Sequence, residues 1–131
     1  MAADEFDLPM IDVPEDAVSP DTIVKFLVNE LVRQGRLLQQ HAISVVGEVL
    51  RRESLGSTGI GRGIAIPHVA TDLIDVAIGV VGRSQKPVNW NALDSQPVHT
   101  VCLLITPKSN SLAALRALEP VVRRVGDVTG I

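Results

Sequence analysis

The spacing of apolar residues predicts a helix that begins near Ser19 and ends near Gly35. Ser19 can cap its first turn, Pro20 suits the first helical position, and Asp21 lies where the helix dipole favours an acid. Gly35 is a typical stop signal. The apolar positions that recur at helical spacing between these signals are Ile23, Phe26, Leu27 and Leu31.

A second helix is predicted over residues 39–53. Ile43, Val46 and Leu50 share one face of this helix. A second apolar row lies beside them and consists of Ala42, Val45 and Val49. The opposite side is charged. It is followed by the glycine-rich stretch 56–63, which we expect to be a loop without regular structure.

Three strands are predicted in the second half of the chain, at residues 64–66, 76–81 and 98–105. The last is almost continuously apolar, as in a central strand that is buried on both faces. Residues 86–91 are polar and turn-like, with at most a short edge strand. A third helix is expected to begin at Asn110 or Ser111 and to be broken or kinked at Pro120.

The predicted order, α-α-β-β-β-α, indicates an α/β fold with a mixed sheet flanked by helices. Of the 131 residues, 46% are hydrophobic but only 2% are aromatic, so the core must be aliphatic. We expect one domain over residues 19–131, preceded by an acidic, irregular leader at residues 1–18.

The charges are distributed unevenly along the chain. Residues 1–24 hold seven acids and no Lys or Arg, whereas the remainder carries a formal +4. This positive balance is too weak, and aromatic residues are too few, to predict a nucleic-acid-binding protein. No apolar run is long enough to span a bilayer, and the N-terminus lacks the pattern of a signal peptide, so we expect a cytoplasmic protein that does not insert into membranes.

The candidate chemistry is concentrated between Arg52 and His68. A histidine that follows a short strand and a glycine-rich turn could accept a phosphoryl group on its imidazole. Ser57, Thr58 and the glycine backbone could bind the phosphoryl oxygens, and Arg52 could supply a positive charge. Each feature alone also has an ordinary explanation: a tight turn, a local hydrogen bond or a solvated arginine.

Other site classes are less well supported. His41, His68 and His99 are too far apart in sequence to indicate a metal site, so we expect none. The glycine-rich stretch matches neither the phosphate-binding P-loop nor the dinucleotide-binding fingerprint, because it lacks the defining residues of each motif. A hydrolase triad of Ser57, His68 and Asp72 lacks a nucleophile elbow. The single cysteine, Cys102, lies in an apolar run and is expected to be a buried hydrophobic residue.

The segment Arg52-Glu53, Ser57-Thr58-Gly59-Ile60-Gly61 and Gly63-Ile64-Ala65-Ile66-Pro67-His68 resembles the signature of the type-2 enzyme IIA domains of the bacterial phosphotransferase system, which include the nitrogen-regulatory proteins. The resemblance covers about residues 18–126. It implies the family's α/β sandwich and a phosphoryl group that originates from phosphoenolpyruvate. It also implies no metal, nucleotide or other cofactor at this domain.

The resemblance assigns His68 as the residue phosphorylated by an HPr-type carrier protein, and Arg52 as the arginine that stabilises the phosphoryl group. Ser57, Thr58 and Gly59 would contribute to phosphate binding. Family members usually carry a second histidine after the last strand; Ser111 occupies that position here. The chain also ends at Ile131, earlier than is usual, so we expect a trimmed chain or a shortened member.

Three functional hypotheses remain at this point. The protein passes phosphate to a downstream enzyme IIB, it regulates a target protein through the phosphorylation state of His68, or it is a regulatory binding module that is weakly phosphorylated or not phosphorylated. No membrane domain, HPr-like domain or enzyme IIB cysteine motif accompanies it in the sequence, which favours the regulatory reading.

Overall fold

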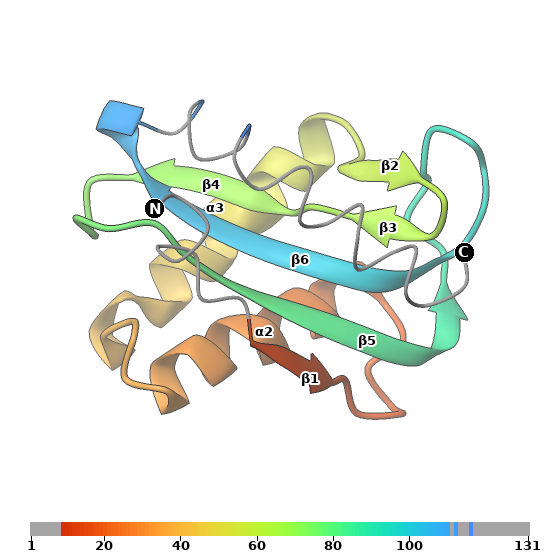
Figure 1. The fold of residues 1–131 in the computed structure, drawn as a ribbon, viewed down its shortest axis with the longest axis horizontal. Coiled ribbons are helices and arrows are strands. Elements are labelled where there is room, and N and C mark those ends of the chain that lie inside the picture. The colour runs from red at the N-terminus through yellow and green to blue at the C-terminus, as the bar shows by residue number, and fades with distance from the viewer. Residues whose placement is uncertain (1–8, 111, 113–115, 117–131) are drawn as a thin grey trace.

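The structure, a computed structural model, describes residues 9–110 together with residues 112 and 116. Helices α2 and α3 lie behind one face of a six-stranded sheet (Figure 1). In chain order the elements are β1 (Met10–Asp12), α2 (Pro20–Arg33), the 3₁₀ helix η1 (Gln39–His41), α3 (Ala42–Leu55), β2 (Gly59–Gly61), β3 (Ile64–Ala65), β4 (His68–Thr71), β5 (Ile78–Val88), β6 (Val98–Pro107) and the 3₁₀ helix η2 (Lys108–Asn110).

Strand β6 is the centre of the sheet. Strand β5 pairs with it antiparallel on one side, and β1 extends the sheet by pairing parallel with β5. On the other side, β3 and β4 both pair with β6 in parallel, and β2 pairs antiparallel with β3. The sheet is therefore mixed, and the predicted α/β class is confirmed. The apolar segment 98–105 is the central strand, as its composition predicted.

Strands β3 and β4 lie end to end along the same edge of β6. Ile64 lies beside Thr100 and His68 beside Leu104, so the register with β6 is unchanged across the interruption. Between them, Pro67 still accepts a hydrogen bond on its carbonyl from the Leu104 N–H at 3.0 Å. The sequence analysis predicted only the first part of this broken strand, at residues 64–66, and missed β4.

Helix α2 begins and ends where its signals predicted. The Ser19 hydroxyl accepts a hydrogen bond from the Thr22 N–H, and the Thr22 hydroxyl oxygen accepts one from the Ser19 N–H, which together make a capping box. Gln34 caps the C-terminus immediately before Gly35. The buried face of α2 packs on the sheet through Ile23, Val24, Leu27, Val28 and Leu31.

Helix α3 buries one of its two neighbouring apolar rows. Ile43 is 86% exposed, whereas Ala42, Val45 and Val49 are buried in the core. Val46 and Leu50 are partly buried at the margin of the core. The two apolar rows are neighbours on the helix surface, so their periodicity alone could not select between them. The row with the smaller side chains faces the sheet.

Part of the segment that was expected to be an irregular leader belongs to the sheet and the core. Met10–Asp12 form strand β1, with Met10 paired to Val81 of β5, and Val13 and Ala17 are buried in the core. A three-residue strand has too few positions to show an alternating pattern, so its pairing with the β5 edge could not be recognised from sequence. Within the described residues, the chain joins the sheet well before the expected boundary at residue 19.

Strand β5 also exceeds its predicted bounds. It continues through Lys86 and Pro87 to Val88, where a polar turn was expected, and a register irregularity separates Arg83 from Val88 in its pairing with β6. The third predicted helix falls almost entirely outside the described residues. None of the helices in the described part of the chain is long and apolar enough to cross a membrane.

The packing of α3 on the sheet can be tested with two substitutions on the same helix. Val45→Ala should lower the free energy of unfolding by about 1–3 kcal/mol, because it removes buried methyl groups and leaves a cavity. Ile43→Ala should change it by less than about 0.5 kcal/mol, because Ile43 is exposed. Urea unfolding followed by circular dichroism measures both values. A larger loss for Ile43→Ala than for Val45→Ala would contradict this packing.

Candidate functional site

The glycine-rich stretch that was expected to be a loop forms a β-hairpin. Strand β2 pairs antiparallel with β3, with Gly59 beside Ala65 and Gly61 beside Ile64. The two-residue turn, Arg62 and Gly63, has positive φ at both positions (60° and 77°), as a type I′ turn requires. Glycines carry no apolar pattern, so the pairing of this segment was not visible in the sequence.

A distant segment, residues 90–94, fastens the hairpin in place. The Leu93 N–H donates a hydrogen bond to the Gly59 carbonyl at 3.2 Å, and the Arg62 N–H donates one to Asp94 Oδ2 at 3.0 Å. A Cβ atom added at Gly59 would lie 2.8 Å from the Cβ of Ala92. Glycine at position 59 is therefore needed for the close approach of this segment.

Thr58 lies at the centre of a buried hydrogen-bond network that joins α3, the hairpin and Trp90. Its hydroxyl donates to Glu53 Oε1 at 2.5 Å, and its N–H donates to Glu53 Oε2 at 2.8 Å. The indole Nε1–H of Trp90, which is 2% exposed, donates to the Thr58 hydroxyl oxygen at 3.2 Å. The sequence analysis assigned no role to Glu53 or Trp90. The only sequence feature that points to this network is that the carboxylate of Glu53 lies five residues before Thr58.

The Ser57 hydroxyl is also bonded within the protein. It donates to the Trp90 carbonyl at 2.5 Å and accepts a hydrogen bond from the Gly59 N–H at 3.0 Å. The predicted phosphate-binding groups at Ser57, Thr58 and Gly59 therefore lie together, but each already has a protein partner. Their assignment to phosphate binding stays a prediction, and it requires these hydrogen bonds to be exchanged.

His68 is the first residue of β4 and is partly exposed. Its Nδ1 lies 2.7 Å from the Ile66 carbonyl oxygen. Because a carbonyl oxygen can only accept, Nδ1 carries the hydrogen of this bond, and the neutral ring has its lone pair on Nε2. Within the described residues, Nε2 has no hydrogen-bond partner. The geometry therefore leaves one ring nitrogen available as a nucleophile.

Arg52 lies in the last turn of α3, which packs against β4. Its Nη1 donates to the Gly56 carbonyl at 2.7 Å, so it caps the C-terminus of the helix. None of the hydrogen bonds among the described residues joins Arg52 to His68. Ser111, the remaining predicted phosphate contact, lies outside the described residues.

The other histidines and the cysteine have local surroundings of a different kind. The ring of His99 covers Gly63, where an added Cβ would lie 2.5 Å from Nε2. Partial burial and the nearby Arg83 lower the pKa of His99. Cys102 is fully buried, as predicted, and burial raises its pKa to about 12. Among residues 9–110, 112 and 116, no three His, Cys, Asp or Glu side chains come together as metal ligands.

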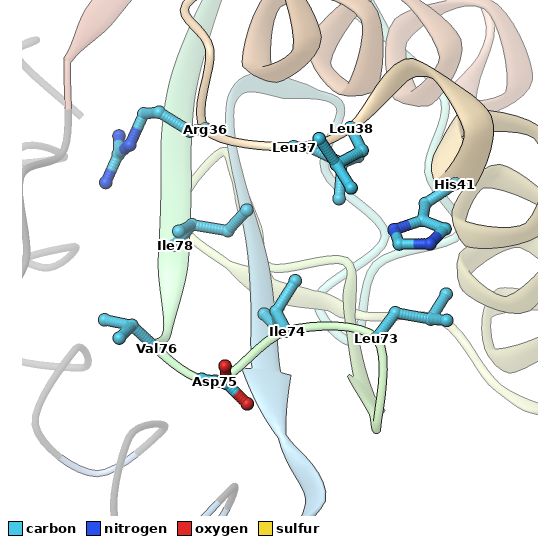
Figure 2. Close-up of a pocket in the computed structure, with 9 residues that line it drawn as sticks. All are labelled: Arg36, Leu37, Leu38, His41, Leu73, Ile74, Asp75, Val76 and Ile78. Carbon is cyan, nitrogen blue, oxygen red and sulfur yellow. The ribbon is translucent and has the colours of Figure 1, made fainter.

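A hollow of about 260 Å³ lies beyond the far end of β4 from His68 (Figure 2). Its walls are mostly aliphatic, and the guanidinium of Arg36 points away from it and donates to the Gly79 carbonyl at 3.1 Å. The hollow therefore lacks converging polar groups that would bind a polar ligand. Its lining residues are Arg36, Leu37, Leu38, His41, Leu73, Ile74, Asp75, Val76 and Ile78.

Comparison with known families agrees with this geometry. The model of the family described as "Phosphoenolpyruvate-dependent sugar phosphotransferase system, EIIA 2" matches residues 6–128. The chain belongs to this family. A nitrogen regulatory protein of Bradyrhizobium diazoefficiens is 31% identical to this enzyme IIA domain in an alignment of 121 residues. The alignment covers 86% of this chain and 79% of that protein. The match spans only about half of the proteins of the same name from Klebsiella oxytoca, Shigella flexneri and Escherichia coli.

Two solved structures share the fold of this enzyme IIA domain. The nitrogen regulatory protein IIA-Ntr of Neisseria meningitidis superposes with a TM-score of 0.75 at 27% identity, covering 91% of this chain and 80% of that one. A complex of the mannitol enzyme IIA with phosphorylated enzyme IIB from Escherichia coli gives a TM-score of 0.69 at 19% identity, covering 92% and 89%. The family resemblance read from the sequence motif is thereby confirmed.

The contact between Asp94 and the hairpin predicts a pH dependence of stability. The hydrogen bonds that Asp94 accepts from the Arg62 and Gln96 N–H groups lower its pKa below the ordinary value of 3.8. A lowered folded-state pKa stabilises the fold above the unfolded pKa, and this contribution is lost as the pH falls through the folded-state value. Asp94→Asn should therefore lower the melting temperature at pH 7, and the difference should shrink below about pH 4.

Thermal unfolding at several pH values measures this difference. Asp75→Asn provides a matched control, since Asp75 is exposed in the loop between β4 and β5. A melting temperature of Asp94→Asn that equals the wild-type value at pH 7, or a difference that grows in acid, would show that Asp94 does not fasten the hairpin.

Proposed function

We propose that His68 accepts a phosphoryl group on Nε2 from a phosphohistidine of an HPr-type carrier protein and passes it to a downstream protein. The observation that carries this proposal is the hydrogen bond from His68 Nδ1–H to the Ile66 carbonyl, which leaves Nε2 unpaired among the described residues at a partly exposed position. Membership of the enzyme IIA family supports the same chemistry.

The transfer balances without an added base. The Nε2 lone pair of His68 forms a bond to phosphorus while the donor's N–P bond breaks and its electron pair returns to the donor imidazole. The donor ring carries a hydrogen on its other nitrogen, so it becomes a neutral imidazole. The phosphorylated His68 ring keeps its Nδ1 hydrogen and so gains a positive charge. The Ile66 carbonyl, 2.7 Å from Nδ1, stabilises that charge through a stronger hydrogen bond. The same steps in reverse order pass the phosphoryl group on.

Arg52 is proposed to stabilise the negative charge of the phosphoryl oxygens. In the structure its guanidinium bonds the Gly56 carbonyl with Nη1, at the end of the helix that packs on β4. A guanidinium has five N–H donors, so it can keep this bond and still offer donors to an anion. Gly59, Ser57, Thr58 and Ser111 remain candidate phosphate contacts of lower priority, since the first three are already bonded within the protein.

The downstream partner is proposed to be a regulatory target protein. Several relatives found in the comparisons are named nitrogen regulatory proteins. An enzyme IIB is the alternative partner, by analogy with the mannitol enzyme IIA in its complex. In a third possibility the domain binds its target without being phosphorylated, and the labelling experiment below separates this case from the other two.

Phosphorylation of His68 is tested by incubating the protein with phosphoenolpyruvate, enzyme I and HPr, and measuring intact mass under alkaline conditions. The wild type should gain one phosphate that is lost in acid. His68→Ala should gain none, because the proposed acceptor nitrogen is removed. His41→Gln is the matched control and should be labelled like the wild type.

A label that persists in His68→Ala would refute the assignment of His68. Absence of a label in the wild type, while an established enzyme IIA is labelled in parallel, would favour the unphosphorylated binding module.

The role of Arg52 is tested with Arg52→Ala and Arg51→Ala. Loss of the charge-assisted contact, worth about 1.5–3 kcal/mol, should lower the transfer rate from HPr about 10- to 100-fold in Arg52→Ala. Arg51→Ala should transfer at nearly the wild-type rate, because Arg51 is an exposed neighbour on the same helix. Quenched-flow labelling gives both rates, and circular dichroism monitors the end of α3. Equal transfer rates for the two variants would show that Arg52 only caps the helix and does not contact the phosphoryl group.

A further inference from the structure

A continuous series of hydrogen bonds connects the end of α3 to the ring of His68. Glu53 accepts from the N–H and hydroxyl of Thr58; the Thr58 carbonyl accepts from the Ile66 N–H at 3.0 Å; and the Ile66 carbonyl accepts from His68 Nδ1–H at 2.7 Å. We infer that Glu53 and Thr58 are positioning residues that set the tautomer and orientation of the His68 imidazole.

Thr58 is fixed on both sides, so its position is well determined. Its hydroxyl has a single hydrogen, and the Trp90 Nε1–H occupies a lone pair of the oxygen. The hydrogen must therefore go to Glu53 Oε1, while the Thr58 N–H goes to Oε2. Both oxygens of one carboxylate thus fix a single residue, and only a carboxylate at position 53 can accept both bonds.

Ile66 transmits this constraint because it lies at the break between β3 and β4. Its neighbours Ala65 and Pro67 are both paired with β6. The N–H of Ile66 instead turns to the Thr58 carbonyl, and its carbonyl turns to the histidine two residues ahead. Thr58 thus orients the peptide group that precedes Ile66. The peptide group that follows Ile66 orients the His68 ring.

The consequence for transfer is geometric. A neutral histidine exchanges freely between two tautomers, and only the form with hydrogen on Nδ1 presents a lone pair on Nε2. An oriented Ile66 carbonyl selects that form and holds the ring at a defined angle to an incoming phosphoryl group. A displacement of about 1 Å at such a site can lower a rate about 100-fold.

This role differs from the direct phosphate contact that the sequence motif suggested for Thr58. Thr58 is 5% exposed, and its hydroxyl is bonded as a donor and as an acceptor within the protein. If Thr58 contacted the phosphate directly, it would affect only the phosphoryl group. A positioning residue sets the tautomer and orientation of the His68 ring before any phosphate is bound.

The test measures the His68 ring in the unphosphorylated protein by long-range ¹H–¹⁵N correlation spectroscopy, which distinguishes the two tautomers. The wild type should have its hydrogen on Nδ1. In Thr58→Val, which removes the hydroxyl and keeps the shape, the population should shift toward the Nε2–H form, and the kcat/KM for transfer from HPr should fall about 10- to 100-fold. Thr58→Ser, which keeps the hydroxyl, should show the wild-type tautomer and the wild-type kcat/KM.

Glu53→Gln provides a second, smaller perturbation. Its amide presents only one acceptor oxygen to two donors, so it should shift the tautomer in the same direction as Thr58→Val. The double variant should be no slower than the slower single variant, because both changes break the same series. Thr71→Val is the matched control: Thr71 is another buried threonine, on the same strand as His68 but outside this series.

The inference rests on the proposed function only for its kinetic part. If the wild type accepts no phosphate, the proposed function fails while the tautomer measurement still tests the positioning. A wild-type His68 with hydrogen on Nε2 would overturn the inference, whether or not the variants fold. An unchanged tautomer in folded Thr58→Val or Glu53→Gln would also overturn it. If the tautomer is unchanged but the transfer rate falls, Thr58 contacts the phosphoryl group directly.

Discussion

The candidate site depends on the backbone groups of Ile66, which lies between β3 and β4 and directs these groups away from β6. Backbone groups that are shielded from water must find partners, so the N–H and the carbonyl of Ile66 need an acceptor and a donor on the side opposite β6. At Ile66 the hairpin supplies the acceptor, through the Thr58 carbonyl, and the histidine ring supplies the donor. Pro67, which has no N–H, follows directly and keeps its carbonyl in the ladder with Leu104. The hydrogen bond that satisfies the Ile66 carbonyl is thus the same bond that sets the tautomer and orientation of the His68 imidazole.

Sequence patterns were sufficient where the determining interactions are local or repeated. The capping box of Ser19 and Thr22 depends on four adjacent residues, and the central strand at 98–105 is apolar at nearly every position. The motif that ends at His68 is distinctive enough to identify the family. Sequence patterns were insufficient for the α3 face, where two neighbouring apolar rows compete, and for β1, which is too short to alternate.

The site itself could be predicted only in part, for a related reason. His68 and Arg52 could be proposed as site residues because their side chains carry recognisable chemistry. The bonds between Trp90 and Thr58 and between Trp90 and Ser57 join residues 32 and 33 positions apart, so no local pattern in the sequence indicates them. Glu53 adjoins Arg52 in the motif, but nothing in the sequence indicated that its carboxylate turns toward the hairpin rather than toward solvent.

The length of β5 has a consequence for the behaviour of the protein in solution. Among the residues that the structure describes, its outer edge is paired with β1 only from Val81 to Arg83, although the strand continues to Val88. The remaining stretch contains Lys86 and Pro87, a charge and a residue without an N–H donor. Both features oppose the addition of a foreign strand. The end of β5 is thereby protected against the edge-to-edge association that leads to aggregation.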